Sequence, residues 1–473
     1  MSALRVDTVA ELLAQSSAVI IDEHETKRTC AEVLAAGSEL ADRLRAAGVQ
    51  VGDRVAVQMT NGPLYVDLLA AAAIGRFVVM NVNLRFAPAL ADSLIERSGA
   101  RLVIRSTDDL PGVATEPLVS ELVEASAEDR YVIFTTSGTT SAPKLVVHQQ
   151  HSIARHAGDV ADAFGYTDSS VVMVPLPLCG VFGFTVLWGA IAGGSTVIMP
   201  TAFEAQQTGD LVQRHGVTSL HGSDDMFHRL LETDCELSSI ETSGYARFNS
   251  ALDGIVERCE ARGVPLSGLY GMSEVQALYA FRGAPGLELE QRWKPAGRLV
   301  SPEAKCRVVD DELQLQGPSL FEGYLRDGGD EIDRELTDSH FDGPWFRTGD
   351  VAAIDGDNSF EYITRMGDVM RLGGFLVAPT EIETVLTQYP GIAQAQVVTV
   401  GLERGARPVA FVIVDEGASV DEPAVIAHCQ ETLARFKCPV KVLAIDAFPV
   451  TDGPNGVKIQ RAELRRMAEL TLT

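Results

Sequence analysis

The sequence lacks the cysteine spacings that are typical of zinc sites and of CxxC motifs. Its seven cysteines lie at positions 30, 179, 235, 259, 306, 429 and 438, and none forms a CxxC pair or a Cys/His spacing suited to zinc. The first residues read MSALRVDTVAELLAQ and contain neither a basic stretch nor an apolar run. We therefore expect no signal peptide, a cytoplasmic location and free thiols.

Basic residues are also scarce. The chain has 39 Lys and Arg against 65 Asp and Glu, which gives a net charge of −26 at pH 7. This balance disfavours nucleic acid as a partner, because such binding depends on clustered Lys and Arg at the phosphates. An anionic small ligand is still compatible, since a local site can be basic or bridged by a metal inside an acidic protein.

One long segment has no charge, yet it lacks the other features of a membrane span. Residues 171–200 read VVMVPLPLCGVFGFTVLWGAIAGGSTVIMP, a length that satisfies a crude transmembrane test. Pro175 and Pro177 interrupt its first part, five glycines interrupt the rest, and no basic cluster flanks it. We expect no membrane span here, but a buried strand, a loop and a helix that lines an apolar cavity.

The order of patterns along the 473 residues predicts two domains. Helical spacing at 29–48 and 63–75 alternates with apolar runs at 54–59 and 76–82, which favours α/β layers with parallel strands. From about residue 297, short strands alternate with turns that contain Gly and Asp. The last hundred residues have the order of a small α+β unit. We expect a large multi-layer α/β domain with parallel-rich sheets and a small β element, followed by a small α+β domain.

A loop rich in hydroxyl groups follows one apolar run. Residues 131–144 read YVIFTTSGTTSAPK, with six hydroxyl side chains around one glycine and a lysine at the end. Backbone amides and hydroxyls around a glycine donate hydrogen bonds to phosphate oxygens, and a lysine adds a positive charge. The Walker pattern GxxxxGK[ST] is absent. Alone, the stretch is a candidate phosphate site, with a surface turn as the alternative.

Four further motifs follow this loop in the chain. They read YGMSE at 270–274, WFRTGD at 345–350, RMGDVMRLGGFLVAPTEIE at 365–383 and PVTDGPNGVKIQR at 449–461. In this order, the five motifs resemble those of the adenylate-forming superfamily. That group contains acyl- and aryl-CoA synthetases, adenylation domains of peptide synthetases and firefly luciferase. The resemblance covers essentially the whole chain.

The resemblance implies a division of labour along the chain. Residues 1–364 would form an AMP-binding N-terminal domain, residues 365–367 a hinge, and residues 368–473 a mobile C-terminal domain. Such enzymes use ATP and Mg²⁺ to convert a carboxylic acid into acyl-AMP and pyrophosphate, and a thiol such as that of CoA then takes the acyl group. Because two anions must meet, positioning and charge neutralisation do most of the work.

The resemblance also implies which residues hold ATP. The loop that starts at residue 136 would wrap the β- and γ-phosphates, Tyr270 would lie beside the adenine, and Asp350 and Arg365 would reach the ribose. The full ATP/AMP set is Thr136, Ser137, Gly138, Thr139, Thr140, Lys144, Gly244, Tyr245, Ala246, Tyr270, Gly271, Asp350 and Arg365. In the SGYARF stretch at 243–248, Arg247 stands where the family has proline.

Three residues match catalytic positions of the family. Glu274 matches the carboxylate that holds Mg²⁺, and Ser273 stands where threonine is usual, which keeps a hydroxyl near the α-phosphate. Lys458 matches the lysine that bridges the substrate carboxylate and the α-phosphate, although Val457 separates it from Gly456. The alternatives are a surface charge for Glu274 and a surface lysine for Lys458.

Three glycines match positions that the family uses to transfer the acyl group to CoA. Gly367 stands at the hinge position where the backbone angles change as the small domain rotates, and glycine permits the widest range of angles. Gly373 and Gly374 would let the pantetheine arm of CoA approach the backbone. A basic patch would favour CoA, and Arg404 and Arg407 are candidates for one.

The acyl pocket departs from the pattern of many relatives, because Cys179 and Gly180 replace an aromatic–His pair. We expect a pocket wide enough for a bulky or branched acid, unless another residue fills the gap. The expected lining is Cys179, Gly180, Phe182, Gly183, Gly268 and Met272. No aspartate near 179–189 is available to pair with an amino group, so an α-amino acid is disfavoured. An aromatic, alicyclic, polycyclic or fatty acid remains.

The main hypothesis is therefore an AMP-forming acid:CoA ligase. One alternative is a stand-alone enzyme that loads the phosphopantetheine of a carrier protein. Others are a non-catalytic binder of nucleotide or acyl groups and an oxygenase of the luciferase type. Leu145 and Gln150 depart from the family pattern, which bears on the choice of substrate more than on adenylation. A homodimer is compatible with the sequence.

Overall fold

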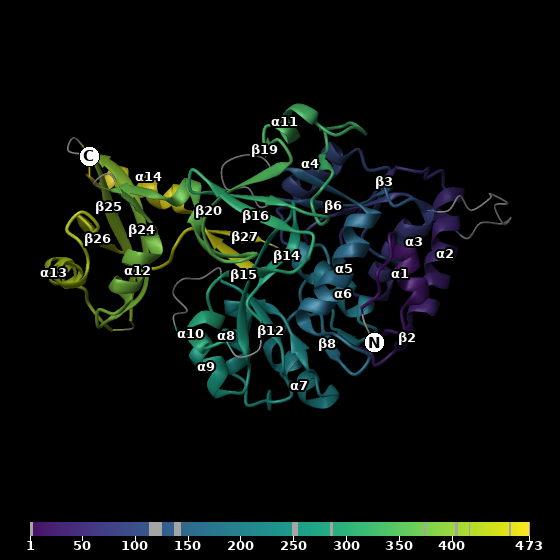
Figure 1. Cartoon of the computed structure of the whole chain (residues 1–473), viewed down its shortest axis with the longest axis horizontal. Coiled ribbons are helices and arrows are strands. Elements are labelled where there is room, and N and C mark those ends of the chain that lie inside the picture. The colour runs from purple at the N-terminus through teal and green to yellow at the C-terminus, as the bar shows by residue number, and fades with distance from the viewer. Residues whose placement is uncertain are drawn as a thin grey trace.

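The computed structural model describes residues 3–112, 125–136, 143–247, 254–283, 287–372, 375–402, 405–415, 417–453 and 456–472, with the backbone alone for 375–376, 451–453 and 456–458. Figure 1 shows a large body that contains the N-terminus and a smaller lobe that is built from the C-terminal region. The large body contains three sheets among the described residues, with helices between and around them.

A mixed sheet of six strands begins the large body. Strands β5, β3, β4 and β6 are parallel to one another, whereas β7 is antiparallel to both of its neighbours, β6 and β18. The order is β18 (Gly323–Tyr324), β7 (Leu145–Gln149), β6 (Arg130–Thr135), β4 (Val78–Asn81), β3 (Arg54–Val57) and β5 (Leu102–Ile104). Because β6 and β7 are neighbours, the two ends of the hydroxyl-rich loop lie side by side where β6 ends and β7 begins.

A second sheet is parallel apart from its last strand. Its order is β10 (Ser219–Leu220), β8 (Val171–Met173), β9 (Thr196–Met199), β1 (Val19–Asp22) and β2 (Lys27–Thr29). Short, fully or partly buried strands of this kind are typical of parallel sheets covered by helices on both faces.

The third sheet changes from parallel to antiparallel along its width. Strands β11 (Gly222–Ser223), β12 (Ser243–Ala246) and β13 (Leu266–Met272) are parallel. The antiparallel continuation contains β14 (Gln276–Phe281), β15 (Ala296–Leu299), β21 (Ser359–Arg365), β20 (Trp345–Gly356), β17 (Glu312–Gln316) and β16 (Lys305–Val309), with β19 (Phe341–Asp342) paired to β20. The β element predicted from about residue 297 is this antiparallel part.

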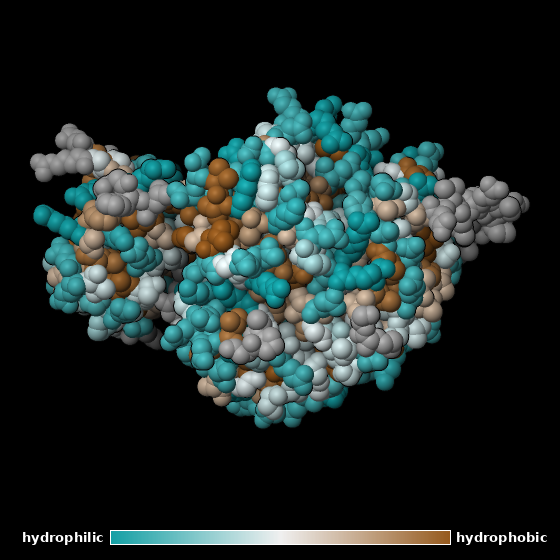
Figure 2. All heavy atoms as spheres, viewed as in Figure 1, coloured by the Kyte–Doolittle hydropathy of each residue, from teal (hydrophilic) through white to brown (hydrophobic). Residues whose placement is uncertain are grey.

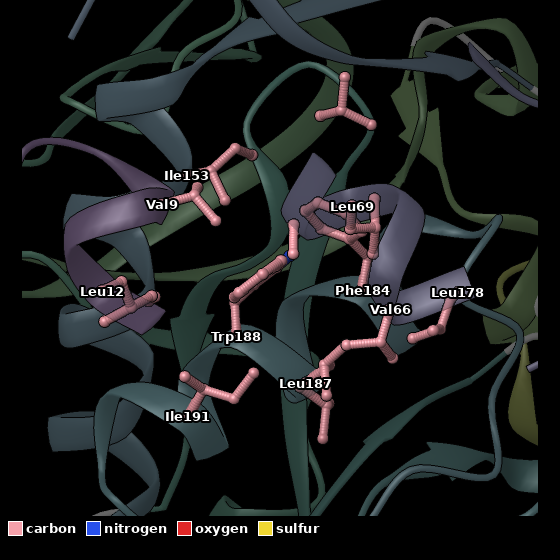
Figure 3. Packing of buried hydrophobic residues seen from close by; sticks show 14 of the residues in the cluster. Val9, Leu12, Val66, Leu69, Ile153, Leu178, Phe184, Leu187, Trp188 and Ile191 are labelled. Carbon is pink, nitrogen blue, oxygen red and sulfur yellow. The ribbon is translucent and has the colours of Figure 1, made fainter. Parts of the chain in front are cut away.

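Helix α6 (Val181–Ala192) lies at the centre of the large body, and all twelve of its residues are buried. Figure 3 shows Phe184, Leu187, Trp188 and Ile191 of α6 among side chains from three other helices. The other helices of the large body are α1 (Val9–Gln15), α2 (Cys30–Ala46), α3 (Pro63–Gly75), α4 (Pro88–Ser98), α5 (Gln150–Phe164), α7 (Ala205–His215), α8 (Asp224–Leu231), α9 (Ile255–Ala261), α10 (Leu289–Arg292) and α11 (Arg334–Asp338). The uncharged segment 171–200 thus forms strand, loop and helix, as predicted.

The smaller lobe has cores of its own, formed from residues between Met370 and Ala468. Its central sheet joins β24 (Ile392–Leu402), β25 (Gly405–Val414) and β26 (Lys441–Ala444). One hairpin, β22 (Met370–Leu372) with β23 (Phe375–Val377), packs against β25. A second hairpin, β27 (Val450–Gly453) with β28 (Gly456–Ile459), extends away from this sheet towards the large body in Figure 1. Its helices are α12 (Pro379–Thr387), α13 (Glu422–Thr432) and α14 (Arg461–Leu472). The predicted fold class, a large α/β region and a small α+β region, is confirmed.

The surface and the thiols agree with the composition. Figure 2 shows a mostly hydrophilic face with scattered hydrophobic residues. All seven cysteines are free, and six of them are buried. In the part of the chain that the structure describes, no helix has the length and apolar character that crossing a membrane requires.

Candidate active site

The hydroxyl-rich loop is closed at its base by Thr136 and Lys144. The Thr136 N–H donates to the Lys144 carbonyl over 3.0 Å. The Lys144 N–H donates to the Thr136 hydroxyl over 2.9 Å. These bonds continue the β6–β7 pairing, in which Thr135 lies opposite Leu145. The predictions for Ser137, Gly138, Thr139 and Thr140 fall outside the described residues.

The Lys144 ammonium has defined neighbours. Its Nζ lies 2.8 Å from His340 Nε2 and 4.6 Å from the centroid of the Tyr324 ring. Burial lowers the pKa of this ammonium below its ordinary value, the charge of Arg365 lowers it further, and the Glu274 carboxylate opposes both effects. Lys144 therefore lies in one electrostatic neighbourhood with a predicted metal ligand and a predicted ribose ligand.

Glu274 and Ser273 occupy the turn between β13 and β14, and two long-range contacts hold this turn. The Tyr324 hydroxyl donates to Glu274 Oε1 over 2.9 Å. His148 Nε2 donates to the Ser273 carbonyl over 2.7 Å. Burial lowers the pKa of His148 to about 4, so its ring is neutral at neutral pH. The turn that carries both predicted catalytic residues is thus fixed by β7 and β18 of the six-stranded sheet.

The donor set around Glu274 suits Mg²⁺ better than a metal that needs several protein ligands. Glu274 is 5% exposed, and one carboxylate oxygen is left after the bond from Tyr324. Across the described ranges, no group of three or more His, Cys, Asp or Glu side chains is placed to hold a metal. A single carboxylate that is completed by substrate phosphates and water is a common arrangement for Mg²⁺.

Asp350, Tyr270 and Arg365 form a second cluster. Asp350 on β20 lies directly opposite Arg365 on β21, and their Oδ1 and Nε atoms are 3.0 Å apart. The Tyr270 hydroxyl donates to Asp350 Oδ2 over 2.6 Å. Burial first, and then the Asp350 charge, raises the pKa of Tyr270 well above its ordinary value. Asp350 is 2% exposed.

The segment before the predicted adenine site is close-packed. The Gly244 N–H donates to His221 Nδ1 over 2.8 Å, and Tyr245 on β12 is buried, with its hydroxyl donating to the Trp293 carbonyl over 2.8 Å. Ala246 ends this strand. A Cβ added at Gly271 would lie 2.1 Å from the Ala277 carbonyl oxygen, so only glycine fits there. The assignment of Gly244, Tyr245, Ala246 and Gly271 to the nucleotide site stays a prediction.

Four of the residues predicted for the acyl pocket lie at the start of α6. Cys179 and Gly180 precede the helix, and Phe182 and Gly183 lie in its first turn. Burial raises the pKa of the Cys179 thiol to about 12, so at neutral pH the thiol is protonated and uncharged and does not act as a nucleophile. A Cβ at Gly183 would lie 2.5 Å from the Leu176 carbonyl oxygen, so the helix packs directly on the preceding loop.

The other two pocket candidates lie on β13. A Cβ at Gly268 would be 2.0 Å from the Lys294 carbonyl oxygen, so backbone covers this position closely. Met272 lies at the end of the strand, and its sulfur is 3.7 Å from the Tyr270 hydroxyl oxygen. Met272 therefore lies next to the Asp350 cluster.

The predicted catalytic lysine lies in the smaller lobe. The Lys458 backbone on β28 pairs with Thr451 on β27, and its side chain is outside the described part. Arg461 follows β28 and forms an ion pair with Glu383 at 2.9 Å. Gly367 lies in the short 3-10 turn Met366–Asp368 that precedes β22, and a Cβ there would have no neighbour within 4 Å. Gly373 and Gly374 fall outside the described residues.

Sequence reasoning missed four residues that support this site. Tyr324 and His340 contact Lys144, His148 holds the turn of Ser273, and Glu383 holds Arg461. Glu383 carried a usable signal, since it is the last residue of the motif at 365–383. Tyr324, His340 and His148 lie outside all five motifs.

Comparisons with known proteins agree with this geometry. The AMP-binding enzyme family matches residues 8–123 and 110–325, and the AMP-binding enzyme C-terminal domain matches residues 381–452. A 2-succinylbenzoate–CoA ligase from Geobacillus kaustophilus is 28% identical, over 96% of each chain. A feruloyl-CoA synthase from an Amycolatopsis species is 28% identical, over 93% of this chain and 94% of its own.

The fold has solved counterparts as well. The crystal structure of ATP-bound MatB from Rhodopseudomonas palustris superposes with a TM-score of 0.86 at 23% identity, and covers 98% of this chain and 100% of its own. This likeness establishes the fold. The family matches together span well over half of the chain and include both lobes. The predicted membership is confirmed: the chain belongs to the family of AMP-binding enzymes.

Proposed function

We propose that the protein is an AMP-forming acid:CoA ligase. It activates a hydrophobic carboxylic acid with MgATP to acyl-AMP and pyrophosphate, and then transfers the acyl group to CoA. The observation that carries the proposal is the pair of clusters described above. Asp350 with its two partners suits a ribose, and Lys144 with Glu274 suits the phosphates. Tyr270, which contacts Asp350, and Glu274 lie four residues apart on β13 and the turn that follows it, so the two clusters are near enough to hold one nucleotide.

Each cluster has a separate task in adenylation. Asp350 is held by Tyr270 and Arg365 and accepts hydrogen bonds from the ribose hydroxyls, which fixes the α-phosphate relative to the protein. Lys144 contributes positive charge at the phosphate end. The Glu274 oxygen that is not bonded to Tyr324 would hold Mg²⁺, which when bound neutralises charge on the phosphates.

Lys458 of the C-terminal region would assist the attack of the substrate carboxylate on the α-phosphorus of ATP. Lys458 would place its ammonium between the acid carboxylate and the α-phosphate, where charge develops. The bond between Arg461 and Glu383 anchors the chain that follows β28 to α12 and so fixes the base of this hairpin. Rotation about Gly367, which has open space around it, would then exchange Lys458 for the CoA-binding face.

The residues around α6 restrict the chemical class of the acid. All α6 residues are buried and uncharged, and the buried Cys179 thiol adds no charge. An aromatic, alicyclic, polycyclic or fatty acid fits such surroundings better than an amino acid does. The same chemistry would serve an enzyme that loads a carrier protein, and this is the second candidate. The free thiols suit the reducing cytoplasm, where we place the enzyme.

A panel of acids tests the proposal. The protein is incubated with ATP, Mg²⁺ and one acid at a time, with and without CoA, and AMP and pyrophosphate are measured. The panel includes 2-succinylbenzoate and ferulate, the acids that the relatives' names contain, together with fatty and polycyclic acids. Release of AMP that depends on the acid and rises with CoA supports the ligase. Acyl-AMP that accumulates and ignores CoA favours a carrier protein, and release of ADP contradicts both.

A further inference from the structure

We propose that His340 is a positioning residue for ATP, which holds the Lys144 ammonium in place for the phosphates. The inference rests on the proposed function and assigns a task to a side chain that no motif includes. His340 lies between α11 and β19, far in sequence from Lys144, and its ring nitrogen Nε2 is 2.8 Å from Lys144 Nζ.

The hydrogen bonds on the other side of the ring fix its tautomer. His340 Nδ1 lies 2.9 Å from the Leu336 carbonyl oxygen. A carbonyl only accepts, so Nδ1 carries the hydrogen and Nε2 presents its lone pair to Lys144. The Ser339 hydroxyl donates to the same carbonyl over 2.6 Å, and the Arg347 N–H donates to the His340 carbonyl over 2.7 Å. The ring is therefore oriented as an acceptor before any ligand arrives.

Tyr324 completes the support for the lysine. Its ring lies under the ammonium at 4.6 Å and makes an edge contact with the His340 ring at 5.2 Å. Its backbone pairs with Val146, two residues after Lys144, and its hydroxyl donates to Glu274. The lysine is thus held by an acceptor and by an aromatic face that contact each other.

This arrangement leaves the lysine able to bind phosphate. An ammonium has three N–H donors, and the bond to His340 uses one of them. A free lysine would lose side-chain entropy when ATP binds, and here much of that loss has already occurred in the folded protein. We therefore expect His340 to increase affinity for ligands that have β- and γ-phosphates, with little effect on AMP.

Two substitutions separate this role from packing. His340→Gln places an amide oxygen near the position of Nε2 and keeps an acceptor for Lys144. His340→Asn places its amide near Nδ1 and keeps only the contact with Leu336. Dissociation constants of MgATP and of AMP are measured by calorimetry for the wild type and both variants, which requires no knowledge of the acid. Thermal unfolding of each variant checks the fold.

We expect His340→Asn to weaken MgATP about tenfold, the loss of one hydrogen bond to a charged group that water partly replaces, and to leave AMP unchanged. His340→Gln should retain most of the affinity. In a Lys144→Ala background, His340→Asn should have no further effect, because the histidine acts through the lysine.

Three results would overturn the inference: wild-type affinity for MgATP in His340→Asn, equal losses in the Gln and Asn variants, or equal losses for MgATP and AMP. An additional loss in the Lys144→Ala background would overturn it too. A wild-type protein that binds neither MgATP nor AMP contradicts the proposed function, and the inference with it. The failure of each claim therefore gives a different result.

Discussion

Replacement of Asp350 by asparagine should remove the negative charge from the predicted ribose site and keep the shape of the side chain. The carboxylate is 2% exposed, accepts from the Tyr270 hydroxyl and pairs with Arg365. Asparagine keeps an oxygen for Tyr270, and the Arg365 side chain is 51% exposed, so water can solvate it after the substitution. The protein should therefore fold, and the effect should appear in nucleotide affinity.

The magnitude follows from the two ribose hydroxyls that Asp350 would accept. A hydrogen bond to a charged group contributes about 1.5–3 kcal/mol, and a neutral one about 0.5–1.5 kcal/mol. Exchanging two of the former for two of the latter costs about 2–3 kcal/mol, which is roughly a 30- to 150-fold loss of affinity. MgATP and AMP should lose affinity equally, because both contain the ribose.

Calorimetric titration with AMP is the assay, and Asp355→Asn is a matched control. Asp355 lies on the same strand β20, five residues after Asp350, and pairs with Arg282 instead of Arg365, so its substitution should leave AMP affinity unchanged. The ligand 2′-deoxy-AMP lacks one hydroxyl, so Asp350→Asn should cost it about half as much free energy. Unchanged affinity for AMP in Asp350→Asn would refute the assignment of the ribose site.

Three further predictions concern the lobe, its lysine and acid stability. Lys458→Ala should abolish formation of acyl-AMP but retain conversion of supplied acyl-AMP with CoA, and parallel loss of both would contradict its role. Glu383→Gln should lower the free energy of unfolding of the smaller lobe by about 3 kcal/mol in urea titrations, because it breaks a buried ion pair with Arg461. Glu381→Gln, whose pair with Lys437 is on the surface, should change it by less than about 1 kcal/mol. Burial lowers the pKa of three histidines, to about 4 for His148 and about 3 for His156 and His221. In the unfolded chain these histidines have a pKa of about 6.5, so between pH 6.5 and pH 4 the unfolded state binds protons that the folded state does not. The free energy of unfolding should therefore fall as the pH is lowered through this range, by up to about 1.4 kcal/mol per pH unit for each histidine. His156→Leu should reduce that slope by one histidine's share, because neither ring nitrogen has a partner among the described residues; an unchanged slope in denaturation curves measured between pH 6.5 and 4 would contradict this.

Local signals predicted much of the fold. The helix expected at 63–75 is α3 with the same bounds, because Pro63 suits a first turn and Gly75 precedes the left-handed Arg76. The helix expected at 29–48 is α2, whose first turn is fixed by the capping box of Thr29 and Glu32. Such boundaries depend on residues a few positions apart, so the sequence contains them.

Part of the site is similarly local. Asp350 and Arg365 lie on adjacent strands of one hairpin and face each other across it, so their spacing already suggests the contact. The contact of Lys144 with His340 joins residues 196 positions apart, and that of His148 with Ser273 joins residues 125 apart. These contacts depend on the order of strands in two different sheets, which no local pattern encodes. The support of Lys144 and Glu274 was therefore visible only in the structure.

Isotope transfer tests the central claim most directly. An accepted acid is labelled with ¹⁸O in both carboxylate oxygens, incubated with ATP, Mg²⁺ and CoA, and the AMP and pyrophosphate are analysed by mass spectrometry. If the carboxylate attacks the α-phosphorus, the AMP gains one ¹⁸O, the pyrophosphate gains none, and the acid leaves as its CoA thioester. Label in pyrophosphate or in free phosphate, or the formation of ADP, would contradict the account.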